Sequence, residues 1–217
     1  MSLFSQMADK YDAWYETKQG QAIMQQEMDC ALSLYRPEPG DLLIDIGCGS
    51  GIFSRLWIEL GARLVGIDES SEMIGVAQEK DDQGLYRVMD MHELDYPDDY
   101  FDAAVSSFAL EFTADPASVL SEARRVVKPG GSILMGTISS QGAYGKDYIK
   151  RGKQGHPIYS QANFHTLEDI LKLYPDEVKG VSECVCFGPH DEVRQDCPEG
   201  EIPSVFFIHW IKSMSAE

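Results

Sequence analysis

The stretch of sequence that decides the fold is Leu42-Leu43-Ile44-Asp45-Ile46-Gly47-Cys48-Gly49-Ser50-Gly51. Its first half is a short apolar run that follows the turn signal Pro37-Glu38-Pro39-Gly40, which is typical of a buried strand. Its second half places three glycines two residues apart, directly before a helical periodicity over 52–60. A glycine loop between a strand and a helix lets backbone N–H groups approach an anionic part of a ligand. The stretch therefore predicts a binding loop, for a carboxylate or a phosphate equally well.

The same strand and helix unit recurs along the chain. Alternation of this kind predicts an α/β fold with a Rossmann-like, doubly wound, seven-stranded and mostly parallel sheet, and the last two strands predict an antiparallel C-terminal hairpin. We expect a single domain over residues 1–217, since this length suits one sizeable core. The expected strands are 42–46, 63–67, 85–89, 101–106, 132–137, 181–187 and 205–211, and the expected helices between them are 52–60, 71–78 and 116–127.

Two segments stand apart from this alternation. The first 40 residues predict two helices, the first with an aromatic face that includes Tyr11, Trp14 and Tyr15. Residues 139–165 carry several glycines and aromatic residues after the fifth strand, where ligands of doubly wound sheets bind, so we expect an insertion on the substrate side. Its basic residues suggest a planar or acidic small molecule as ligand, or simply a solvated helix face: Lys146, Lys150, Arg151 and Lys153.

Composition limits the partners and the location. The formal charge of −18 opposes binding to a phosphate backbone, so we expect no nucleic-acid partner. We expect no membrane association either, because no apolar run approaches the roughly 20 residues of a spanning helix. The sequence shows no secretory signal, and we expect a cytoplasmic protein, monomeric or homodimeric. Five scattered cysteines predict reduced thiols and no metal site.

The main alternative for the glycine loop is a dinucleotide-binding dehydrogenase. Its fingerprint places the third glycine one residue later, at the position of Ile52. Both interpretations use an acidic residue about 20 positions further on to hold a ribose hydroxyl, and Asp68 satisfies both. The spacing of the glycines and the motifs that follow must therefore distinguish the two.

Four motifs in order resemble those of class I S-adenosylmethionine-dependent methyltransferases. They are Asp45 to Gly51, Val65-Gly66-Ile67-Asp68, Asp90-Met91 ahead of Pro97 to Asp102, and Leu120 to Gly131 with its Lys-Pro-Gly-Gly turn. The sequence is most similar to the small-molecule branch that includes the ubiquinone and menaquinone biosynthesis methyltransferases, over residues 4–137. The resemblance implies a methyltransferase that transfers a methyl group to an O, N, C or S atom of a small molecule.

The resemblance also implies roles for individual residues. Asp45 would order the glycine loop and the methionine amino group, Asp68 would accept the ribose hydroxyls, and residues 1–40 would form a helical lid over the cofactor. Met73 would lie against the adenine or belong to the helix core, and Asp90 would accept from the adenine amino group. The full set of expected contacts with S-adenosylmethionine is Tyr11, Asp45, Gly47, Cys48, Gly49, Gly51, Asp68, Glu69, Met73, Asp90, Met91 and Ser106.

The acceptor chemistry is less constrained by the sequence. Family members often carry histidine where this chain has Glu111, which is a departure from their pattern. For an acceptor that must lose a proton, the candidate catalytic residues are Glu111 and His165, with His156 as a further candidate. Two other function classes remain open at this point, an NAD-dependent oxidoreductase and a regulator that binds S-adenosylmethionine without catalysis. The cysteines raise an arsenic methyltransferase as a narrower alternative.

Overall fold

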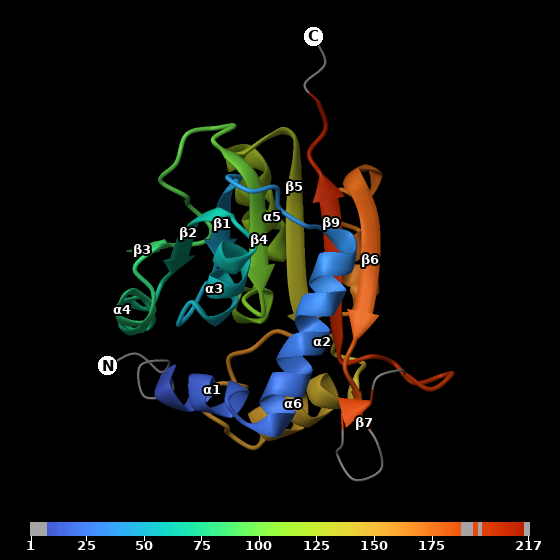
Figure 1. The fold of residues 1–217 in the computed structure, drawn as a ribbon. Helices are drawn as coiled ribbons and strands as arrows, with labels where there is room; N and C mark the ends of the chain where they lie inside the picture. The colour runs from blue at the N-terminus through green and yellow to red at the C-terminus, as the bar shows by residue number, and fades with distance from the viewer. Residues whose placement is uncertain (1–7, 188–192, 195–196, 215–217) are drawn as a thin grey trace.

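A seven-stranded sheet in the order β3-β2-β1-β4-β5-β9-β6 forms the centre of the molecule (Figure 1). The computed structural model describes residues 8–187, 193–194 and 197–214, with side chains from residue 12 onward. Neighbouring strands from β3 to β5 are parallel, and β9 is antiparallel to both β5 and β6. This confirms the predicted sheet and its antiparallel end. The strands are β1 (Leu42–Ile46), β2 (Arg63–Asp68), β3 (Leu85–Val88), β4 (Phe101–Ser107), β5 (Val127–Ile138), β6 (Val178–Cys184) and β9 (Val205–Ile211).

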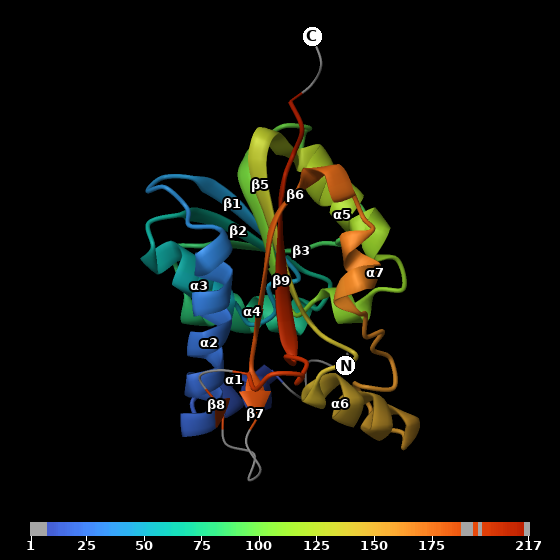
Figure 2. The same ribbon diagram turned by 90° about the vertical axis from the view of Figure 1, so that its right-hand side faces the viewer.

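Helices cover both faces of the sheet, and β1 shows why. Leu43 packs on one face among residues of α2 (Lys18–Leu34), α3 (Ile52–Glu59) and α4 (Ser71–Lys80). Its neighbour Ile44 packs on the other face with α5 (Pro116–Val126) and α7 (Leu167–Leu171). Successive side chains of a strand point to opposite faces, so an apolar run buried on both sides requires helices on both sides. Figure 2 shows α2 and α3 on one side of the sheet and α5 and α7 on the other.

Most element boundaries agree with the expectations, and the exceptions have local causes. Helix α2 begins at Lys18 instead of near residue 21, because the Thr17 side chain accepts a hydrogen bond from the Gly20 amide and caps the helix. Strand β5 begins at Val127, five residues earlier than expected, because the Lys-Pro-Gly-Gly segment continues as extended chain beside β4, with an irregular register between Phe101 and Ala103. The helical stretch expected within 139–163 is α6 (Ala143–Lys153).

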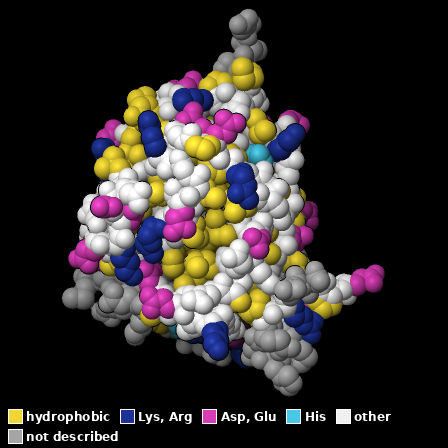
Figure 3. Space-filling model, viewed as in Figure 1, with side chains coloured by type: hydrophobic (Ala, Val, Ile, Leu, Met, Phe, Trp, Pro, Cys, Tyr) yellow, Lys and Arg dark blue, Asp and Glu magenta, His cyan; other side chains and the backbone are white. Residues whose placement is uncertain are grey.

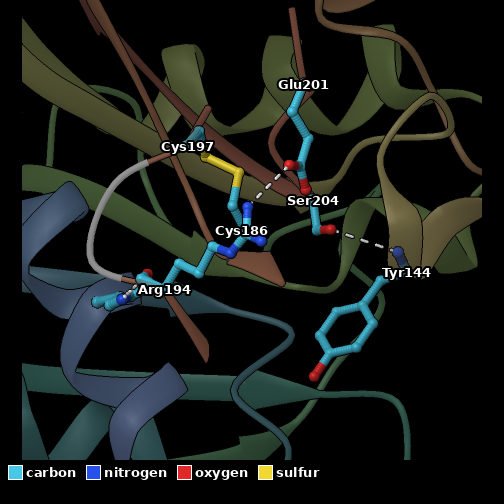
Figure 4. Close-up of a disulfide and its surroundings, with 7 residues drawn as sticks. Tyr144, Cys186, Arg194, Cys197, Glu201 and Ser204 are labelled. Atoms are coloured by element: carbon cyan, nitrogen blue, oxygen red, sulfur yellow. Dashed lines mark hydrogen bonds and ion pairs between the residues drawn. A yellow bond between two sulfur atoms is a disulfide. The ribbon is translucent and has the colours of Figure 1, made fainter. Parts of the chain in front are cut away.

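A second, two-stranded sheet was not predicted. Strands β7 (Cys186–Phe187) and β8 (Val193–Arg194) pair with each other, and Cys186 forms a disulfide with Cys197, their Cα atoms 5.3 Å apart (Figure 4). The expectation that the cysteines are reduced thiols is therefore wrong for this pair. The spacing gave no signal, because the β7–β8 pairing brings together two cysteines that lie 11 residues apart. The other three cysteines are free thiols.

The helices outside the alternating pattern gather at one end of the sheet. Helix α1 (Ala8–Tyr15) and α6 lie below the ends of the strands in Figures 1 and 2, which is the end where β4 and β5 terminate. The space-filling view in Figure 3, taken from the same side as Figure 1, shows hydrophobic side chains gathered in the middle of the side toward the viewer, with basic and acidic side chains interspersed around them. Among the helices that the structure describes, none combines the length and apolar character of a membrane-spanning helix.

Candidate functional site

A cavity of about 820 Å³ lies at the carboxyl ends of the parallel strands. The turns after β1, β2, β3 and β4 form one side of it, and residues of α1, α2 and α6 form the other. Ligands of doubly wound sheets bind at this edge. Of the residues expected to contact a cofactor or to act in catalysis, the following line the cavity: Asp45, Gly47, Cys48, Gly49, Asp68, Glu69, Met73, Met91 and Glu111.

The loop after β1 requires its glycines. Gly47, Gly49 and Gly51 all have positive φ angles, between 55° and 74°, which residues other than glycine rarely adopt. A Cβ at Gly47 would lie 2.3 Å from the Cβ of Ala109, whereas the space beside Gly49 is open. Gly51 shapes the start of α3 and does not line the cavity. The loop therefore brings backbone, and no side chain, to the cavity at Gly49.

Asp68 holds this loop in place. Its Oδ2 accepts the Gly49 amide at 3.0 Å, and its Oδ1 accepts the Ser70 amide at 2.9 Å. Burial raises the pKa of Asp68, and the two amide hydrogen bonds oppose that rise. The resemblance predicted that Asp45 orders the loop. In the structure, the carboxylate that accepts a hydrogen bond from a loop amide is that of Asp68.

Asp45 is bonded to the helix behind the loop. It lies on the face of β1 that packs against α3, and its Oδ2 accepts a hydrogen bond from the Ser54 hydroxyl at 2.5 Å. The side chain is 2% exposed but lines the cavity. Burial raises its pKa to about 7, the Ser54 hydrogen bond opposes this, and the charge of Asp68 adds to it. A carboxyl group with this pKa changes its charge readily when a cation binds beside it.

The side of the cavity near β2 and β3 is apolar and sulfur-rich. Met73 on α4 and Met91 after β3 line it as expected, and Met89 joins them. Asp90 does not line it: its side chain is 63% exposed, and its Oδ1 accepts the His92 amide and lies 2.7 Å from the His92 ring. Asp90 therefore contacts the neighbouring turn and not the cavity.

At the end of β4, the alternation of the strand decides which serine faces the cavity. The hydroxyl of Ser106 donates to the Ile46 carbonyl at 2.7 Å and is buried in the sheet, whereas Ser107 lines the cavity. The next residue, Phe108, has a φ of 62°, an unusual conformation for a bulky side chain and one that concentrates at functional sites. This turn directs the chain from β4 into the cavity wall.

Two buried glutamates lie in the cavity wall beyond this turn. Glu111 follows β4 in the short helix η1 (Leu110–Phe112) and is 1% exposed, and Glu27 on α2 is 4% exposed. Burial raises the pKa of both, and the charges of Cys30 and Glu111 raise the pKa of Glu27 further. The sequence analysis singled out Glu111 but missed Glu27. The signal that could have found Glu27 is its place on the apolar stripe of α2, between Ile23 and Met28.

Aromatic residues form the wall opposite the glycine loop. The rings of Tyr148 and Tyr159 stack with their centroids 4.1 Å apart, and Tyr144 stacks on Tyr148. Of the four basic residues near α6, only Arg151 lines the cavity, with its guanidinium carbon 4.9 Å from the Tyr159 centroid; the three lysines are exposed on α6.

The two candidate histidines lie outside the cavity lining. His165 forms an isolated bridge with Ser139, its Nε2 is buried without a hydrogen-bond partner among the described residues, and burial lowers its pKa. His156 stacks on Tyr159, with the ring centroids 4.2 Å apart. Of the three residues considered for proton transfer, Glu111 is thus the one that lines the cavity.

Helix α1 is fixed to the loop side of the cavity by one buried residue. Asp12 is 3% exposed, accepts a hydrogen bond from the Ser50 hydroxyl, and pairs with Lys80 of α4 at 2.5 Å. Trp14 and Tyr15 of the same helix line the cavity. The side chain of Tyr11, the residue that the sequence analysis selected, lies outside the described part of the structure.

Comparisons with known proteins show what this chain is similar to. Residues 44–135 match the family described as "Methyltransferase domain". The chain is therefore similar to a methyltransferase domain over that segment. Its fold is that of the class I enzymes, which use S-adenosylmethionine as methyl donor.

One curated relative and two solved structures illustrate the match. The chain is 33% identical to a malonyl-[acyl-carrier protein] O-methyltransferase of Serratia marcescens over 64% of this chain and 52% of that protein, so it spans about half the length of this relative. A Thermotoga maritima protein, described as an S-adenosylmethionine-dependent methyltransferase and possible histamine N-methyltransferase, has a TM-score of 0.76 at 22% identity and covers 97% of this chain and 98% of that one. A Haloferax volcanii methyltransferase in complex with its activator Trm112 has a TM-score of 0.75 at 19% identity, over 98% and 99%.

The residues of the cavity fit S-adenosylmethionine. The cavity lies within the range of about 300–1,000 Å³ typical of ligand sites. Each oxygen of Asp68 accepts one amide, and since an ionised carboxylate offers roughly four acceptor positions, capacity remains for ribose hydroxyls. The open space beside Gly49 suits the methionyl part, and Met73 with its neighbouring methionines suits a flat adenine ring.

Proposed function

We propose that this protein transfers a methyl group from S-adenosylmethionine to a small molecule that binds in the same cavity. The observation that carries the proposal is that the glycine loop, Asp45 and Asp68 all lie at one cavity, within the segment that matches a methyltransferase domain. A dehydrogenase has no comparable support, because that match covers the glycine loop on which the alternative depended.

The sheet order suggests how the two ligands share the cavity. Asp68 and the methionines lie at the ends of β2 and β3, so we assign the adenosine to that side. Glu27, Ser107 and Glu111 lie on the side of β4 and β5, which leaves that side for the acceptor. When bound, S-adenosylmethionine supplies an already activated methyl group, so the protein mainly has to align the acceptor and exclude water.

Particular segments of the chain suit these tasks. We assign residues 1–40 the role of a lid, because Trp14 and Tyr15 line the cavity and Asp12 ties their helix to the glycine loop. We assign residues 139–165 to the acceptor side of the same single domain, because Tyr144, Tyr148 and Tyr159 form the opposite wall. Aromatic side chains on two sides can exclude water from the reacting atoms.

Equilibrium dialysis with tritiated S-adenosylmethionine tests the proposal. We expect the wild-type protein to bind it and Asp68→Asn to bind at least about 10-fold more weakly, since the amide group replaces an acceptor of the Gly49 amide and of a ribose hydroxyl. Asp29→Asn on α2 is the control, because Asp29 is exposed and bonds only to Gln25 among the described contacts. Folded wild-type protein that binds no S-adenosylmethionine would defeat the proposal.

Transfer of the label separates an enzyme from a regulator that only binds the cofactor. An enzyme transfers tritium to an acceptor in a screen of small amines, alcohols, thiols and acids. A regulator binds the labelled donor with the same dependence on Asp68 but transfers nothing.

A further inference from the structure

The acceptor side of the cavity contains two buried acids and no buried base among the described residues. Glu27 comes from α2 and Glu111 from the turn after β4, and both line the cavity. Burial raises the pKa of Glu27, and the charge of Glu111 adds to that rise. Among the described residues that line the cavity, Arg151 is the one Lys or Arg; its side chain is 44% exposed, and its Nη1 lies 3.7 Å from Asp147 Oδ2.

Glu111 is only half satisfied by the protein. Its Oε1 accepts the Ile138 amide at 2.6 Å, and its Oε2 is buried without a close hydrogen-bond partner among the described residues, although the neighbouring Thr137 hydroxyl lowers the pKa of the group. For Glu27, the Tyr15 hydroxyl donates to Oε2 over a long 3.4 Å. Neither glutamate forms a salt bridge with any described residue. Buried carboxylates are costly without a cationic partner, so a ligand that supplies a cation would relieve this cost.

The surrounding walls suit the rest of such a ligand. Trp14 of α1, Phe108 of the turn after β4 and Tyr148 of α6 line the cavity and present aromatic surface to it. Aromatic faces attract cations and pack well against flat or apolar groups. The buried titratable side chains on this side of the cavity are thus acids, which favours a cationic ligand over the acidic ligand expected from the exposed basic residues of α6.

We propose that the methyl acceptor is a small-molecule amine whose ammonium group binds between Glu27 and Glu111. This inference rests on the proposed methyl transfer. In the reaction the ammonium gives one proton to a carboxylate of the pair, and the freed lone pair forms the new N–C bond. The S–C bond of the donor breaks with its electron pair retained by sulfur, and the accepted proton later leaves to solvent. A carboxyl group whose pKa is raised by burial is suited to accept that proton.

A second role for the two acids gives a different result in the same experiment. If the two acids balance the positive sulfonium of the donor, their neutralisation weakens the binding of S-adenosylmethionine and leaves the binding of S-adenosylhomocysteine unaffected. If they hold an ammonium of the acceptor, their neutralisation weakens the binding of amines and leaves the binding of both cofactor forms unaffected. Measurements with both cofactor forms therefore separate the two roles.

The test is calorimetric titration of wild-type protein saturated with S-adenosylhomocysteine. The probes are benzylamine, 2-phenylethylamine and tryptamine, each paired with the alcohol that replaces its amine: benzyl alcohol, 2-phenylethanol and tryptophol. We expect at least one amine to bind about 10-fold or more tightly than its alcohol. We expect Glu111→Gln to remove that preference while S-adenosylhomocysteine binds within twofold of wild type. Glu168→Gln, on an exposed side chain of α7, is the matched control and keeps the preference.

Each outcome bears on one claim. If the wild type does not bind S-adenosylhomocysteine, the proposed function itself fails. If the wild type binds it but no amine binds better than its alcohol, the amine proposal is overturned and the proposed function stands. The same conclusion follows if Glu111→Gln keeps the preference for the amine, or if this variant weakens only the binding of S-adenosylmethionine. Should Glu111→Gln lose S-adenosylhomocysteine as well, Glu27→Gln provides the same comparison, and an unchanged amine preference in that variant would also overturn the proposal.

Discussion

Asp45 is an acid in the middle of an apolar strand, and its environment has a consequence for stability. Its pKa in the folded protein is about 7, well above that of an exposed aspartate, so the folded state keeps a proton that the unfolded state releases. The contribution of Asp45 to the free energy of unfolding is therefore fully present below about pH 4 and is lost as pH rises through about 7. Three pKa units correspond to about 4 kcal/mol, as an order of magnitude.

In the protein without cofactor, Asp45→Asn should remove the part of the fall in unfolding free energy that Asp45 causes as pH rises. Glu27, Glu111 and Asp68 have pKa values raised in the same direction, so the informative quantity is the difference between variant and wild type. We expect the fall in unfolding free energy between pH 4.5 and pH 8 to be about 2–4 kcal/mol smaller in the variant, measured by urea unfolding. An equal fall in both proteins would show that Asp45 does not retain its proton.

Several of the residues predicted from the sequence to contact a cofactor line the cavity, and others, including Ser106 and Asp90, do not. Asp68 and the glycines could be recognised because the loop geometry demands those residue types at a fixed spacing. Ser106 was chosen in place of Ser107 because one residue along a strand reverses the side-chain direction. Asp90 was placed in the cavity by the resemblance, yet local hydrogen bonds to His92 hold its carboxylate outside.

Helix α1 depends on a small number of contacts, which makes it the element most open to a test. Asp12→Asn keeps the size of the side chain but removes the charge that pairs with Lys80. Because Lys80 is 40% exposed, the ion pair contributes only about 0–1 kcal/mol. We expect faster amide hydrogen exchange over residues 8–15 and roughly 3-fold to 10-fold weaker binding of S-adenosylmethionine, with the overall fold retained.

The control for this prediction is Asp29→Asn on α2, which removes an exposed acid from the adjacent helix. Unchanged exchange in α1 of the Asp12 variant would mean that the helix is held by its aromatic contacts alone. These include Tyr15, whose ring lies 5.7 Å from that of Phe53 in an edge-to-face arrangement.

Elements with a strong local pattern were predicted well, and those defined by long-range contacts were not. Strand β1 and strand β9 have the expected bounds because an apolar run between turns specifies a buried strand. The β7–β8 pair is only two residues long on each side, too short for a periodic signal, and the disulfide beside it joins cysteines without a recognisable spacing. Figure 4 shows the same region next to α6, where the Ser204 hydroxyl accepts the Tyr144 amide at 3.3 Å.

For the whole molecule, the order of the strands determines the division of the cavity. The turn after β1 and the carboxyl ends of β2 and β3 offer the glycine loop, an acid and methionines, whereas the side of β4 and β5, with α2 and α6, offers two buried acids and aromatic walls. The alternation of strands and helices was enough to predict the sheet and the edge at which ligands bind. Glu27 could not be predicted as part of the site, because only the packing of α2 over that edge brings it into the same cavity lining as Glu111.

A crystal structure with saturating S-adenosylhomocysteine would show directly how the cavity is divided between donor and acceptor. We expect the ribose at the Asp68 carboxylate, the adenine against Met73 and Met91, and the homocysteine over Gly47 and Gly49, with its sulfur facing the side of Glu27 and Glu111. Density for the ligand outside this cavity, or in it with the adenine on the side of Glu111, would overturn this division and the methyl transfer proposed from it.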